Sequence, residues 1–264
     1  MTANGLIPVG SSELYLETSG SGPPVLFIHA GVADSRMWDR QFDALSDFHL
    51  IRFDMRGFGR SSLGSEPFTN HHDVLAVLDH LGVDRAVLVG CSIGAGTALH
   101  VADEEPGRVA GLVLVGADAP GFDPGIDYQS PEWPEALRAF EKGDLMRVAQ
   151  LDAEMWLAGR DRSTSDLDPS QVGLFVEMDL IALANETERD ELDAAEPLDR
   201  LTPLDVPVLV VVGDRDLPQL IAAADHLAAL SDTPVTTIRD SAHLPSMDKP
   251  DEFNEALLTF LAAR

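Results

Sequence analysis

The chain has 264 residues, of which 45% are hydrophobic and 24% are charged. This composition suits one large globular domain, or a core with an inserted subdomain, and excludes an intrinsically disordered chain. The formal net charge of −27 disfavours nucleic acids and anionic membranes as partners, because both would be repelled. No apolar stretch approaches the ~18 residues of a membrane span, and no signal peptide is apparent, so we expect a cytoplasmic protein.

Short apolar runs alternate with helical patterns along most of the chain. After an antiparallel strand predicted in ELYLETSGSGPP, near-continuous runs of Val, Leu and Ile predict strands buried on both faces. These runs are PPVLFIHAG, FHLIRFDMRG, DRAVLVG, GLVLVGA and VPVLVVVGD, with PVTTIRD as an edge strand. Helical periodicity lies at 36–46, 70–81, 92–104, about 218–230 and 251–262. The alternation predicts an α/β fold with a mostly parallel central sheet flanked by helices.

Residues 118–200 interrupt this alternation. They contain no convincing strand, carry helical patterns around 133–158 and 170–188, and hold 21 acidic against seven basic residues. We therefore predict a helical cap at 118–200, inserted after the strand in GLVLVGA, over a core made of 1–117 and 201–264.

The segment GCSIG at 90–94 joins an apolar run to the start of a helix rich in small residues. The pattern G-x-S-x-G in this setting predicts a sharp turn that exposes Ser92 as a nucleophile. A glycine-rich turn that only packs a helix on a strand is the alternative. Cys91 is the single cysteine and cannot form an internal disulfide; we expect it to be a small buried residue that points away from the cleft.

A serine nucleophile needs a base, and the base needs an acid that orients it. The segment GDRD supplies Asp214 and Asp216 directly after a strand, and His243 lies in a later loop before the last helix. The other seven histidines lie on strands or helices; His29 ends a strand, where we expect it to shape the adjacent loop. The chain order serine, acid, histidine is that of hydrolase-fold enzymes.

With these landmarks, HAGVADSRMW at 29–38 and DMRGFGRS at 54–61, the whole chain resembles the α/β-hydrolase fold superfamily. Within this superfamily it most resembles the branch that contains 3-oxoadipate enol-lactonases and related small carboxylesterases. The resemblance implies Ser92 as nucleophile, His243 as general base and Asp216, rather than Asp214, as the acid. It also implies an oxyanion hole formed by the backbone N–H groups of Ile93 and Gly31.

The sequence departs from the family at Ala30, where a glycine is usual. Asp54 and Arg56 match a loop that is structural in the family. A serine at the nucleophile position argues against the dehalogenases and epoxide hydrolases of this fold, which use aspartate there. No nucleotide-binding motif follows a strand and no metal-ligand cluster is apparent, so we expect neither cofactor nor metal.

The predicted reaction is transfer of an acyl group to water, on a neutral small-molecule ester or lactone. Trp133 and Trp156 are candidate substrate-binding residues in the cap, with Met155, Phe175 and Met178 as further candidates for the same pocket or for the core of the cap. An anionic substrate would need an arginine against the acidic field, and the candidates are Arg36, Arg160 and Arg162.

Other activities stay open. A carbon–carbon bond hydrolase or a cofactor-free perhydrolase or haloperoxidase would keep the same three residues. A ligand-binding protein with this fold and little turnover is an alternative of another class. We expect a monomer or a homodimer that binds no nucleic acid and no membrane.

Overall fold

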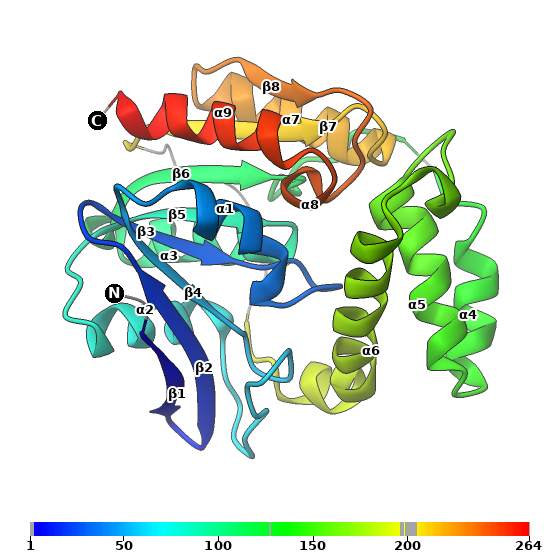
Figure 1. Cartoon of the computed structure of the whole chain (residues 1–264), viewed down its shortest axis with the longest axis horizontal. Helices are drawn as coiled ribbons and strands as arrows, with labels where there is room; N and C mark the ends of the chain where they lie inside the picture. Colours follow the sequence, from blue (N-terminus) through cyan, green and yellow to red (C-terminus); the bar gives the residue numbers. More distant parts are fainter. Residues whose placement is uncertain (1–2, 127, 196–197, 199–204, 264) are drawn as a thin grey trace.

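A computed structural model describes residues 3–126, 128–195, 198 and 205–263. Its centre is an eight-stranded sheet in the order β1-β2-β4-β3-β5-β6-β7-β8 (Figure 1). The strands are β1 (Ala3–Val9), β2 (Ser12–Ser19), β3 (Pro24–Ile28), β4 (His49–Phe53), β5 (Ala86–Cys91), β6 (Val109–Val115), β7 (Val208–Gly213) and β8 (Val235–Ile238). From β4 to β8 neighbouring strands are parallel, as predicted from the near-continuous apolar runs.

The strand β1 is the one that the sequence analysis did not predict. It pairs antiparallel with β2, from Ala3 opposite Thr18 to Val9 opposite Ser12, and β2 pairs antiparallel with β4. The segment contains Asn4, Gly5 and Pro8, which are poor strand formers. Its position at the edge of the sheet tolerates proline because one side of an edge strand needs no ladder partner.

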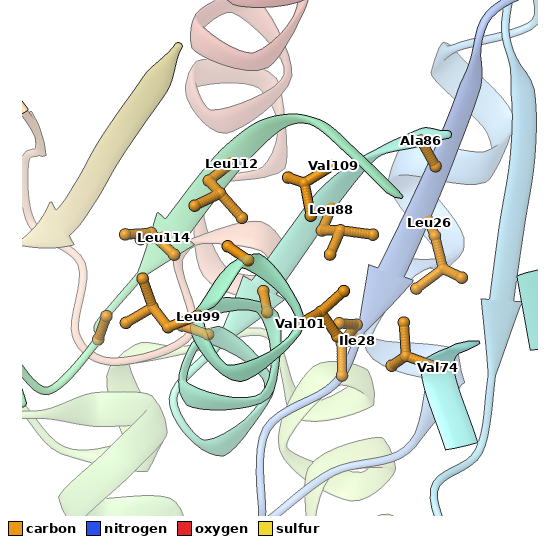
Figure 2. Close-up of a cluster of buried hydrophobic side chains, with 14 of the residues drawn as sticks. Leu26, Ile28, Val74, Ala86, Leu88, Leu99, Val101, Val109, Leu112 and Leu114 are labelled. Atoms are coloured by element: carbon orange, nitrogen blue, oxygen red, sulfur yellow. The ribbon is translucent and has the colours of Figure 1, made fainter. Parts of the chain in front are cut away.

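Helices cover both faces of the sheet. The helices α2 (Asn70–His80), α3 (Ile93–Glu104) and α7 (Pro218–Leu230) share one buried cluster with one face, and α1 (Asp39–Ala44), α8 (Pro245–Asp248) and α9 (Pro250–Ala262) share another with the opposite face. Strand residues alternate between the clusters: Leu26 and Ile28 of β3 face α2 and α3 (Figure 2), whereas Phe27 faces the other side. This is the three-layer arrangement expected of a parallel sheet.

The segment between β6 and β7 is helical in its described part. It contains α4 (Trp133–Glu141), α5 (Leu145–Asp152), the π-helix η3 (Ala153–Ala158), the 3-10 helix η4 (Thr164–Asp166) and α6 (Pro169–Leu192). The pattern predicted around 133–158 is two helices and a π-turn, because Gly143 with a φ of +73° ends the first helix. These helices form one group beside the sheet (Figure 1). The cap boundary predicted at residues 200 and 201 lies outside the described residues.

Among the described residues, no helix has both the length and the hydropathy that crossing a bilayer requires.

Candidate active site

Ser92 occupies the turn between β5 and α3. Its backbone has a φ of +55° and a ψ of −119°, a conformation that non-glycine residues rarely adopt. Such a residue costs on the order of 1–3 kcal/mol and persists only where the surroundings hold it. The Ser92 N–H donates to the Val115 carbonyl (2.9 Å), and the Ser92 carbonyl accepts from the Ala95 N–H (2.8 Å).

The glycines on either side of Ser92 are required by close backbone contacts. A Cβ on Gly90 would overlap the Gly94 carbonyl oxygen, and a Cβ on Gly94 would overlap the Ile28 carbonyl oxygen. The helix α3 can therefore start directly against β3 and β5 only with glycine at both places. The pattern G-x-S-x-G thus has a steric cause in this chain.

His243 and Asp216 form a buried hydrogen-bonded pair. The His243 Nδ1 lies 2.9 Å from Asp216 Oδ2, and the two side chains are 3% and 1% exposed. The other carboxylate oxygen of Asp216 accepts from the Leu217 N–H (2.8 Å). Two donors therefore hold the Asp216 carboxylate beside the imidazole. The second ring nitrogen of His243, Nε2, stays available for other contacts.

The topology places these three residues at one edge of the sheet. Ser92 follows β5, Asp216 follows β7 and His243 follows β8, and these strands are parallel members of one sheet. Their carboxyl ends therefore lie along the same edge. The Cys91 thiol is 3.5 Å from the His243 carbonyl oxygen, which places the histidine loop beside the turn at Ser92.

Asp214 does not take part in this pair. It is exposed, and its N–H donates to the Ile238 carbonyl (3.1 Å), while Asp216, two residues later, is buried. The residue pattern left both aspartates as candidates for the acid. Their different positions in the loop after β7 now distinguish them.

Sequence reasoning missed Gly116 and the backbone contact made by Trp156. Gly116 directly follows β6 with a φ of +52°, and a Cβ there would lie 2.8 Å from His243 Nδ1 and 3.3 Å from Asp216 Oδ2. The His243 N–H donates to the Trp156 carbonyl (3.1 Å), so the cap contacts the histidine loop directly. The glycine after the apolar run GLVLV was the available signal for Gly116.

The predicted oxyanion residues lie next to each other. A Cβ on Gly31 would be 3.6 Å from Ile93 Cγ2, and the Ile93 N–H is in the first turn of α3, where backbone donors have no partner within the helix. The Ala30 side chain, which stands where the family has glycine, is fully buried in the cluster with Met37. Its methyl group is therefore accommodated in the core.

The buried side chains of His29 and Asp54 form hydrogen bonds with backbone groups of the loops after β3 and β4. The Met55 N–H donates to His29 Nε2 (2.9 Å) and the His29 Nδ1–H donates to the Ala30 carbonyl (2.8 Å), while burial lowers the pKa of this histidine. Asp54 accepts from the N–H groups of Ser35 and Arg60, at 2.9 and 2.8 Å. His29 and Asp54 therefore tie the loops after β3 and β4 together.

Arg56 and Cys91 are also buried. The Arg56 side chain forms a buried ion pair with Asp73 (2.7 Å), in keeping with a structural role for its loop. Burial raises the pKa of the Cys91 thiol well above its usual range, so Cys91 is a poor nucleophile.

The two tryptophans predicted to bind substrate line one cavity between the helical segment that follows β6 and the start of α7. It has a volume of about 340 Å³ and is also bordered by Met155, Leu217 and Gln219. Trp133 is 42% exposed, and the Trp156 ring lies 4.8 Å from the His243 ring. Phe175 and Met178 are fully buried in the core cluster instead. The cavity therefore borders the loop that carries Asp216, and one of its lining residues, Trp156, contacts His243.

The three arginines considered for an anionic substrate are engaged elsewhere. Arg36 pairs with Asp34 (2.8 Å) and Glu177, and Arg162 pairs with buried Asp248 (2.7 Å). Arg160 donates to the backbone carbonyls of Asp216 (2.8 Å) and Asp214 (3.0 Å). Arg160 therefore supports the loop that carries the acid.

A mostly parallel sheet with a sharp serine turn after a central strand defines the hydrolase-fold class of α/β proteins. A family model described as the alpha/beta hydrolase fold matches residues 23–250, and the chain belongs to that family.

Three relatives illustrate its range. A non-heme haloperoxidase of Rhodococcus erythropolis is 28% identical over 95% of this chain and 96% of its own. The solved structure of Est816, described as an N-acyl homoserine lactone degrading enzyme, has a TM-score of 0.77 at 26% identity and covers 97% of this chain and 100% of its own. An enol-lactonase from Burkholderia xenovorans LB400 has a TM-score of 0.79 at 25% identity and covers 98% and 100%. Fold and relatives together indicate a hydrolase.

Proposed function

We propose that the protein is a serine hydrolase that cleaves an ester or lactone bond through Ser92, His243 and Asp216. The observation that carries the proposal is the strained backbone of Ser92 at the end of β5, on the sheet edge where the His243–Asp216 pair lies. A packing turn has no need of a positive φ at serine, or of a buried histidine and aspartate on two later loops.

In this proposal His243 Nε2 takes the Ser92 hydroxyl proton as the oxygen attacks the carbonyl carbon. The oxyanion accepts hydrogen bonds from the Ile93 and Gly31 N–H groups, each worth about 3–4 kcal/mol in comparable sites. The imidazolium then gives its proton to the leaving oxygen, and an acyl group remains on Ser92. His243 next activates a water that releases the acid, while Asp216 holds the Nδ1–H tautomer.

The charge distribution supports a neutral substrate. Arg36 and Arg162 are each paired with carboxylates, and Arg160 donates to backbone carbonyls. The net charge of −27 opposes the approach of a carboxylate. The cavity that borders the loop of Asp216 is lined by Trp133, Trp156 and Met155, which suit an apolar acyl or alcohol group.

The test is labelling and turnover. We expect a fluorophosphonate to label Ser92 and p-nitrophenyl acetate or butyrate to be hydrolysed. Ser92→Ala should lose both, with kcat lower by about 10⁴-fold or more. Cys91→Ala and the exposed control Ser65→Ala should keep both. A folded wild type with no labelling and no turnover of any ester would instead favour a ligand-binding protein.

Perhydrolysis is a second candidate, favoured by the haloperoxidase relative that matches nearly the whole chain. In that reaction hydrogen peroxide replaces water in the second step: its oxygen attacks the acyl carbon, Ser92 leaves with a proton, and a peracid forms. The two activities are separated by measuring peracid and free acid from one ester in the presence of peroxide. Ser92→Ala should abolish both products.

A further inference from the structure

A cluster of two histidines and a glutamate lies outside the candidate active site. His71 and His72 are in the first turn of α2, and Glu104 is the last residue of α3. His71 Nε2 is 3.0 Å from Glu104 Oε2, and His72 Nε2 is 3.1 Å from Glu104 Oε1. One potential ligand atom from each side chain lies within 4.8 Å of the others.

The fold holds these side chains in place. The helices α2 and α3 contact each other and share one buried cluster, to which Val74 and Val101 belong (Figure 2), and the start of α2 lies beside the end of α3. The His71 side chain is only 12% exposed, and its ring is stacked on that of His100 at 5.2 Å and 11°. Two imidazole nitrogens are therefore directed at the same carboxylate from a supported position.

The donor chemistry favours a metal over a simple ion pair. One protonated histidine would satisfy Glu104, whereas two protonated imidazoles side by side repel each other. Two neutral imidazoles and a carboxylate form a ligand set that Zn²⁺ and similar ions prefer.

The remaining geometry is compatible with such an ion. Tetrahedral Zn²⁺ with bonds of about 2.0–2.2 Å needs its ligand atoms roughly 3.3 Å apart. The His72 and Glu104 side chains are 59% and 48% exposed, so they have room to move closer and to admit water as a fourth ligand. The net charge of −27 raises the local concentration of cations.

We propose that His71, His72 and Glu104 bind a divalent ion of the zinc class. The ion would join α2 to α3 next to the place where the cap returns to the core. There the Phe68 N–H donates to the Leu192 carbonyl (3.0 Å) and the Ala194 N–H donates to the Phe68 carbonyl (2.8 Å). Ser92 lies at the opposite end of α3, about 18 Å away along the helix, so the site stabilises the fold and takes no part in ester cleavage.

The test uses protein freed of metal with a chelator and titrated calorimetrically with ZnCl₂. We expect one Zn²⁺ bound far more tightly than Mg²⁺ or Ca²⁺, with a rise in Tm. His72→Ala and Glu104→Gln should each weaken this binding by about tenfold or more. The exposed His80→Ala, at the other end of α2, is the matched control and should bind Zn²⁺ as the wild type does.

Surface carboxylates of so acidic a chain could also hold cations, and two results would reveal this. Equal Zn²⁺ affinity of wild type and His72→Ala would overturn the proposal, as would comparable affinity for Mg²⁺. Imidazole ¹⁵N spectra give a second readout: His71 and His72 resonances should shift with one equivalent of Zn²⁺. Circular dichroism and ester turnover of the metal-free variants should match the wild type, which separates loss of binding from loss of folding.

Discussion

At the scale of single residues, the candidate active site depends on a few positions with narrow steric and electrostatic tolerance. Asp216 has both carboxylate oxygens engaged and is almost fully buried, while Asp214 is exposed two residues earlier. Gly116 leaves the space that the His243 ring occupies. Each of these contrasts gives a paired experiment.

Asp216→Asn should lower kcat for p-nitrophenyl acetate by about 10³–10⁴-fold, because an amide can present its NH₂ to Nδ1 and favour the wrong tautomer. Asp214→Asn should change kcat less than about twofold, since it lies outside the pair. Steady-state kinetics of the two variants at one pH is the measurement. A large loss in Asp214→Asn with little loss in Asp216→Asn would reverse the assignment.

Gly116→Ala should lower both kcat and stability, because the new Cβ would lie 2.8 Å from His243 Nδ1. Gly82→Ala is the control: it has a φ of +64°, close to the +52° of Gly116, and no atom within 4 Å of the added Cβ. Both variants carry the cost of positive φ, about 1 kcal/mol or more. Only Gly116→Ala should lose ester turnover; equal turnover in the two would show that the contact has no effect on the histidine.

At the scale of elements, the helices of the cap are joined by a buried pair of carboxyl groups. Asp152 ends α5 and Asp179 lies in the middle of α6, and they are 7% and 1% exposed. The two carboxyl groups interact with each other, and Glu186 and Arg189 of α6 also act on Asp179. Burial, and then the neighbouring Asp152, raise the pKa of Asp179 to about 9; burial raises that of Asp152 to about 6.

The pair makes stability dependent on pH. The usual pKa of an aspartate is 3.8, so between about pH 4 and 9 the folded state keeps a proton on Asp179 that the unfolded state has lost. The free energy of unfolding therefore falls as pH rises through this range, by up to about 1.4 kcal/mol per pH unit for one full proton.

Asp179→Asn should remove this dependence, because an amide donates to Asp152 without a titrating proton. We expect the variant to be more stable than the wild type at pH 8–9, by about 1 kcal/mol or more, with a smaller difference at pH 5. Urea unfolding at several pH values measures this. Glu188→Gln, an exposed position on the same helix, controls for the loss of one charge and should leave the wild-type slope unchanged.

At the scale of the whole molecule, the net charge of −27 on 264 residues sets up repulsion that ion pairs offset locally. Arg52, for example, bridges Glu17 (2.7 Å) and Asp39 (2.5 Å), and Arg162 pairs with Asp248. Acidic residues outnumber basic residues by 45 to 18, so long-range repulsion between carboxylates remains after the ion pairs have formed.

Salt should therefore stabilise the protein. Raising NaCl from about 10 mM to 0.2 M shortens the Debye length from about 30 to below 10 Å and screens the repulsion between surface carboxylates. We expect Tm to rise over this range and then to level off. Sucrose in the same buffer is the control, because it stabilises proteins without screening charges. A Tm that falls with added NaCl would mean that the local ion pairs outweigh the long-range repulsion.

Much of the fold could be read from local pattern. Parallel strands buried on both faces must be near-continuously apolar, so β3 to β7 were predictable, and α2, α3 and α7 agree with the predicted ranges to within a residue. The strand β1 was not, because Asn4, Gly5 and Pro8 have low strand propensity, and the contacts that stabilise it, pairing with β2 and burial of Ile7, are tertiary. The break at Gly143 divides a pattern that periodicity alone presents as continuous.

Residue types and their spacing along the chain were sufficient to predict the α/β class, the serine turn at 90–94 and the chain order of serine, acid and histidine. The pairing of His243 with Asp216, which the family resemblance implied and the residue pattern left open, is seen in the folded chain. The space that Gly116 leaves for the imidazole and the contact of His71 and His72 with Glu104 could be found only there. Such contacts join residues on different strands and helices. Their distances follow from how the sheet and helices pack, which no local pattern specifies.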